Sequence, residues 1–128
     1  MAYAPTISIA VATGTPLKNQ IDTATVTVNN SSGTVDVVID GVEVVPDTNS
    51  PLIVGETSPD WLPQAGSNQA ATYGKTTVTA GTNATFTFPI IAPVAGTYNI
   101  NANVIGTRSD NGSRIMLCTS SAAQIVVS

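Results

Sequence analysis

Residues 22–29 read DTATVTVN, and this stretch decides the fold class. Ala24, Val26 and Val28 alternate with three threonines. A period of two residues is the period of a β-strand, so the aliphatic side chains share one face and the hydroxyls share the other. The segment is therefore predicted to be a strand that covers a core with its aliphatic face.

The same alternation recurs along the chain, with turn residues between the runs, and no segment shows a capped apolar period of 3.6 residues. Further strands are predicted over 6–13, 75–80, 84–91, 98–104, 113–119 and 124–127. This spacing is typical of a sandwich or barrel. We therefore predict an all-β antiparallel sandwich of about 7–9 strands, with residues 1–128 forming one domain.

A hairpin is predicted around Asp40-Gly41. This dipeptide favours a two-residue type I′ turn. Across such a turn Ile39 would face Val42, so the aliphatic side chains of both strands would point inward.

The alternation fails between residues 45 and 74, where four prolines interrupt the chain. Loops this long in compact domains tend to be functional or disordered. Only Leu52, Ile53 and Val54 could form a short strand here, and Trp61 is the one tryptophan. These four residues are the predicted partner-binding set, and a Trp61→Ala change should weaken binding without unfolding the domain. Trp61 could equally cover an open end of the sandwich.

The surface is predicted to be neutral and polar. Only 9% of the residues are charged, against roughly 25% in an ordinary globular protein, and such a surface suits packing against neighbours. The net charge is −4, with two lysines and two arginines at residues 18, 75, 108 and 114. Binding to nucleic acid or to an anionic membrane is disfavoured because both need many cationic contacts.

Catalytic and metal-binding patterns are missing from the sequence. Histidine is absent, which excludes Ser-His-Asp and Cys-His pairs and histidine metal sites. Asp36 and Asp40, with Glu43 across the predicted hairpin, could form a carboxylate cluster for glycoside hydrolysis or calcium. A solvated acidic strand face explains these three residues more simply. We predict no enzyme activity, no cofactor, and a small buried Cys118.

Three stretches resemble parts of immunoglobulin-like domains. Gly96-Thr97-Tyr98 resembles the corner at which a tyrosine hydroxyl binds nearby backbone, and Tyr98 would be that corner tyrosine. Residues 24–30 and 37–41 resemble the "V-x-V-x-N" strand and "V-x-V-D-G" hairpin of bacterial and phage modules of this fold.

A module of this fold that is rich in Thr, Asn, Ala and Val and poor in Lys resembles bacteriophage capsid decoration, or cement, proteins. The resemblance implies a structural protein of the virion that binds the major capsid protein and stabilises the shell, with copies meeting as a homo-oligomer on the capsid surface. No export signal is recognised at the start of the chain, so synthesis in the host cytoplasm is expected.

An alternative is a carbohydrate- or cell-surface-binding module of a phage fibre or a bacterial surface protein. It would use Trp61 together with one flat neutral face. That predicted face consists of Asn99, Asn101, Asn103, Thr85 and Thr87.

Overall fold

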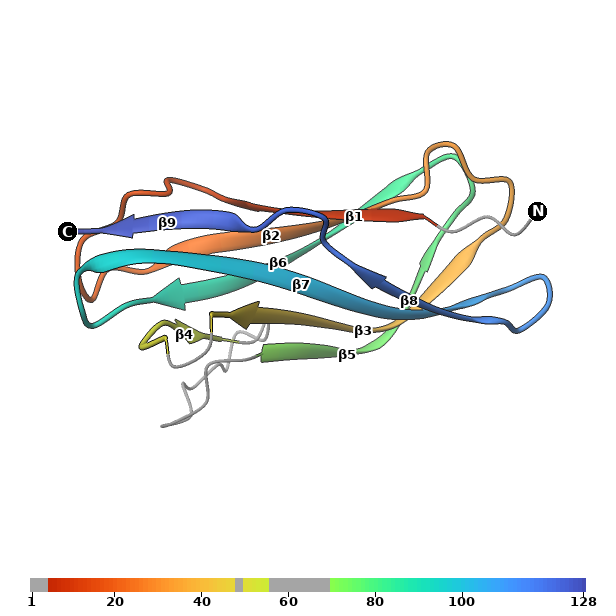
Figure 1. Ribbon diagram of the computed structural model, residues 1–128. Coiled ribbons are helices and arrows are strands. Elements are labelled where there is room, and N and C mark those ends of the chain that lie inside the picture. The colour runs from red at the N-terminus through yellow and green to blue at the C-terminus, as the bar shows by residue number, and fades with distance from the viewer. Residues whose placement is uncertain (1–4, 48–49, 56–69) are drawn as a thin grey trace.

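The computed structural model describes residues 5–47, 50–55 and 70–128, and in these residues the protein is a sandwich of β-strands without a helix (Figure 1). The nine strands are β1 (Thr6–Val11), β2 (Asp22–Asn29), β3 (Val37–Pro46), β4 (Ile53–Val54), β5 (Ala70–Val78), β6 (Asn83–Ile91), β7 (Gly96–Arg108), β8 (Arg114–Cys118) and β9 (Ala123–Val127). No helix in this part of the chain is long and apolar enough to cross a membrane.

The strands form two antiparallel sheets. Sheet A has the order β1-β2-β6-β4, and sheet B has the order β5-β3-β7-β8, with β9 also paired to β7. These orders correspond to the A-B-E-D and C-F-G sheets of the immunoglobulin-like sandwich. Strand β5 adds an edge to sheet B beside β3. The predicted fold class, an all-β immunoglobulin-like sandwich, is confirmed.

The core lies between the sheets and is aliphatic. Ala24, Val26 and Val28 of β2 are fully buried, as the alternation predicts, and Phe88 of β6 is the largest fully buried side chain. Phe86 is only partly buried against this core. At about 25 cal/mol per Å² of apolar surface removed from water, this core is the main source of stability.

The predicted hairpin at Asp40-Gly41 is wrong. Strand β3 continues through this dipeptide, and both neighbouring strands, β5 and β7, shift register between Ile39 and Gly41. Because of this irregularity the inward-pointing residues are odd-numbered up to Ile39 and even-numbered from Val42, and both of these residues are buried. A tight turn and a bulge leave the same aliphatic pattern in the sequence.

Regular structure also enters the segment predicted as a long loop over 45–74. Strand β3 extends through Pro46, and β5 begins at Ala70. The short strand predicted at residues 52–54 is present as β4, which pairs with the end of β6.

The predicted tyrosine corner is confirmed. The Tyr98 hydroxyl donates a hydrogen bond of 2.6 Å to the carbonyl oxygen of Val94. A Cβ atom on Gly96 would lie 3.1 Å from that hydroxyl, so glycine makes room for the ring.

Cys118 is exposed, so the prediction of a buried thiol is wrong. The side chain lies at the end of β8, an edge strand.

Candidate functional site

The four predicted partner-binding residues do not form one surface in the described part of the chain. Leu52 and Val54 are 1% and 5% exposed and belong to the sandwich core. Ile53 is partly exposed and pairs with Ile91 of β6. Trp61 lies outside the described residues, so its binding role stays a prediction. Leu52 and Val54 anchor the segment before it.

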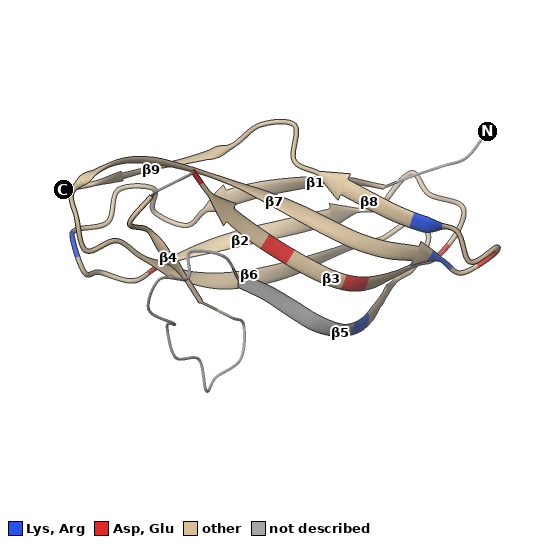
Figure 2. Cartoon of the chain, turned by 60° about the horizontal axis from the view of Figure 1, so that its bottom comes forward, with Lys and Arg blue, Asp and Glu red and all other residues tan. Residues whose placement is uncertain are grey.

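The outer face of sheet A carries no charge in the strands that the structure describes. Its four strands contain one Asp, Glu, Lys or Arg residue, Asp22, whose side chain points inward and is 4% exposed. The outward side chains are mostly hydroxyls and amides: Thr6, Ser8, Thr23, Thr25, Thr27, Asn29, Asn83, Thr85 and Thr87. Figure 2 shows β1 and β6 without a coloured segment, whereas β3 carries two acidic ones.

The strand register arranges these hydroxyls in rows across sheet A. Ser8, Thr27 and Thr85 lie side by side, and Thr25 lies beside Thr87 in the next row. Threonine loses little conformational freedom when its surface is covered, because its β-branched side chain is already stiff. The face is therefore a preformed array of neutral hydrogen-bonding groups.

Exposed aliphatic side chains adjoin this array at the end of the sheet that carries β4. Ile53 and Ile91 pair there, and Ile21 directly precedes β2 with 60% of its surface exposed. Leu17 and Val94, which are 61% and 53% exposed, lie in loops joined by the hydrogen bond from Asn19 N to Ala92 O. This end of the face therefore combines exposed aliphatic side chains with neutral polar ones.

Asp22 secures the start of β2 from the inside of the sandwich. Its carboxylate accepts hydrogen bonds from the Thr13 hydroxyl at 2.8 Å and from the backbone N–H groups of Thr13, Gly14 and Thr23. Burial is the largest influence on the pKa of Asp22 and raises it, but these hydrogen bonds together outweigh burial, so the pKa lies below its ordinary value. Asp22 is a structural residue, and the sequence pattern gave no signal of its partners.

The predicted cluster of Asp36, Asp40 and Glu43 is not assembled, because the hairpin that would bring Glu43 across from Asp40 does not exist. Asp40 accepts a 2.8 Å hydrogen bond from the Thr107 hydroxyl. Glu43 accepts one from the Asn103 amide at 3.3 Å. Each acid of β3 thus has a separate partner on β7, and no metal-binding group of three or more His, Cys, Asp or Glu residues exists among the described residues.

The neutral face predicted from asparagines and threonines divides between the two sheets. Asn99, Asn101 and Asn103 point outward from β7 in sheet B, whereas Thr85 and Thr87 point outward from β6 in sheet A. The prediction of one shared face is wrong, since the two rows lie on opposite layers of the sandwich.

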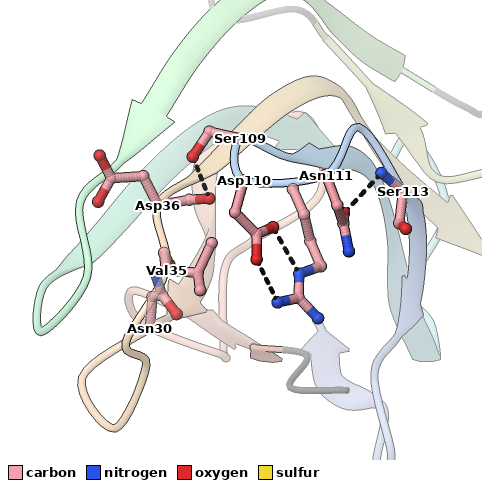
Figure 3. Close-up of polar contacts among 8 residues, drawn as sticks. Asn30, Val35, Asp36, Ser109, Asp110, Asn111 and Ser113 are labelled. Atoms are coloured by element: carbon pink, nitrogen blue, oxygen red, sulfur yellow. Dashed lines mark hydrogen bonds and ion pairs between the residues drawn. The ribbon is translucent and has the colours of Figure 1, made fainter. Parts of the chain in front are cut away.

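The connection from β7 to β8 is closed by polar contacts (Figure 3). Arg108 donates two hydrogen bonds to Asp110, at 3.1 and 2.7 Å. Asn111 accepts from the Ser113 N–H at 2.9 Å, which is an Asx turn. Ser109 binds the carbonyl oxygen of Asp36 through its hydroxyl. These carboxylate and amide oxygens are used inside the turn.

A small pocket lies between β1 and the connection from β8 to β9. It is lined by Ile7–Ile9 and by residues 119–122, and its volume is about 130 Å³. Pockets for drug-sized ligands occupy roughly 300–1,000 Å³. This pocket therefore fits a single side chain better than a whole ligand.

Comparisons with known proteins support the fold. No protein-family profile and no curated protein sequence matches the chain. Among solved structures, the sporulation control protein Spo0M from Bacillus subtilis is similar with a TM-score of 0.55 and 13% identity, over 98% of this chain and 50% of that chain. The ASH/PapD-like domain 7 of human CEP192 is similar with a TM-score of 0.47 and 11% identity, over 100% of this chain and 92% of that chain. The chain thus spans half of the Spo0M chain, and at 13% identity the likeness to Spo0M indicates a shared fold alone.

Proposed function

We propose that this chain is a non-enzymatic structural protein that binds a large protein assembly through the outer face of sheet A. The single observation that carries the proposal is the absence of charge from that face in a protein whose net charge is −4. A permanent contact removes water from both surfaces, and removing water from an unpaired charge costs far more than removing it from a hydroxyl.

The assembly that we propose is a virus shell, and the role is that of a capsid decoration protein bound to the major capsid protein. The resemblance in composition and strand motifs supports this role. Exposed aliphatic side chains beside the neutral array, such as Ile21 and Leu17, would contribute apolar burial to the contact. Nucleic acid and membranes are not among the proposed partners.

Co-sedimentation tests this function. The purified chain should pellet with capsids assembled from the major capsid protein of the virus that encodes this chain. It should also raise the temperature at which those capsids disassemble. A chain that stays in the supernatant at all concentrations would contradict the proposal.

A second candidate function is carbohydrate or cell-surface binding through sheet B. The observation that favours it is the pairing of amides and carboxylates on one exposed face, where Asn103 binds Glu43 and Asn99 binds Asp47. Such groups are hydrogen-bonding partners for sugar hydroxyls. Binding to a defined sugar on a glycan array, without binding to capsids, would favour this function over the first.

A further inference from the structure

Within residues 5–47, 50–55 and 70–128, strand β1 pairs with β2 alone, so its other edge keeps backbone groups that no described strand uses. The Ala12 N–H donates to the Thr23 carbonyl at 2.9 Å, so alternate residues before Ala12 also bind β2. The N–H and C=O groups of Ile7, Ile9 and Val11 therefore point away from the sheet. The hydrogen bond from Asn30 N to Thr82 O shows that the even-numbered residues of β2 bind β6, so its odd-numbered residues bind β1, in agreement with this assignment.

The other described sheet edges are short, charged or covered. Strand β4 has 2 residues, β5 contains Lys75 and β8 contains Arg114. The edge of β9 is covered, because Val126 N binds Gly14 O at 2.8 Å and Ser128 N binds Pro16 O at 3.2 Å.

Strand β1 has none of these protections. Its 6 residues, TISIAV, contain no charge and no proline. Natural proteins place charged residues or proline on exposed edges, because an edge without them pairs with other strands.

We infer that β1 pairs in antiparallel fashion with β1 of a second copy of this chain, with the two-fold axis at Ile9. The pairing is self-complementary: Ile9 lies opposite its own copy, and Ile7 lies opposite Val11 of the other copy. It joins two neutral sheets into one, and the acids of β3, Asp40 and Glu43, belong to the other layer of each copy. Copies with a net charge of −4 thus meet along an edge that does not repel.

The pocket beside β1 supports an added strand. Ile7–Ile9 and residues 119–122 line this pocket, so it adjoins the edge to which the second β1 would be added. Its volume is about 130 Å³, which leaves room for one side chain of the second strand. The added strand covers the half-buried Ile9 and Val11 as well.

Sedimentation equilibrium tests the pairing without any capsid, so its result is separate from that of the proposed function. One strand pair covers less than the roughly 1,200–2,000 Å² of a standard interface. The dimer is therefore weak, and the measurement extends to about 1 mM protein.

Two double variants test the register. Ser8 and Ala10 are exposed on β1, and in the inferred pair Ser8 of one copy faces Ala10 of the other. Ser8→Lys/Ala10→Lys places like charges opposite each other twice and should weaken the dimer by about tenfold. Ser8→Lys/Ala10→Glu places opposite charges together and should restore it. Equal thermal unfolding midpoints of the two variants control for folding.

Amide hydrogen exchange gives an independent measurement, because the Ile7 and Ile9 amides should become protected only in the dimer. A chain that is monomeric at every concentration, or a dimer weakened equally by both variants, would overturn the inference. Protection of the Ile9 amide that requires added capsids would also overturn it, since the edge would then pair with the shell protein.

Discussion

The Tyr98 hydroxyl and the Val94 carbonyl oxygen lie 2.6 Å apart, which fixes the turn that leads from sheet A into β7. Tyr98→Phe removes this hydrogen bond and leaves the carbonyl without its partner. We expect a loss of about 1 kcal/mol in the free energy of unfolding, measured by urea denaturation. Gly96→Ala should cost less in the Tyr98→Phe background than in the wild type, because its Cβ would lie 3.1 Å from the missing hydroxyl. Strict additivity would contradict this account of the corner.

The buried carboxylate of Asp22 should make the stability of the fold depend on pH. Its folded pKa lies below the ordinary value of 3.8, so the charged carboxylate stabilises the fold above pH 3.8, and this contribution is lost as pH falls through the folded pKa. Asp22→Asn should destabilise the protein at pH 7 by about 1–3 kcal/mol, because buried donors lose a charged acceptor. Urea midpoints of both proteins from pH 7 down to acid should converge. If the difference between the two urea midpoints stayed constant with pH, ionisation of Asp22 would not be the source of the pH-dependent stability.

Asn30 connects two turns from a fully buried position. Its amide donates to the carbonyl oxygens of Val35 and Val78, at 3.0 and 3.1 Å. Asn30→Asp removes both donors and buries a charge, so we expect a loss of about 2 kcal/mol or more. Asn83→Asp, at an exposed position in β6, is the matched control and should leave the thermal midpoint nearly unchanged. Similar losses in both variants would rule out the role assigned to Asn30.

The strands were predictable because burial on one face imposes a period of two. The eight residues of β2 and the hydrogen bond of Tyr98 follow directly from that pattern and from the resemblance. The bulge at Asp40 was not predictable, since a turn and a one-residue register shift keep Ile39 and Val42 inward equally well. The partners of Asp22 and Asn30 depend on contacts between distant segments, which a single sequence does not encode locally.

The candidate site was partly predictable. The scarcity of charge is visible in the composition. The sheet on which the uncharged face lies is set by the strand order, which places Thr87 in sheet A and Asn101 in sheet B. The burial of Leu52 and Val54 was missed because a two-residue strand carries no periodicity. The interpretation of residues 52–54 as surface rested on the expectation that the whole segment is a loop.

The most direct test of the binding face compares Thr87→Glu with Thr97→Glu. Both threonines are exposed, but Thr87 lies on the outer face of sheet A and Thr97 lies on β7 of sheet B. Each variant adds the same charge, so the two differ in location.

Co-sedimentation with capsids of the same virus provides the measurement. We predict that Thr87→Glu reduces capsid binding by about tenfold or more, because the added carboxylate would be buried without a partner, while Thr97→Glu binds like the wild type. Equal binding by the two variants, or a loss confined to Thr97→Glu, would contradict the account.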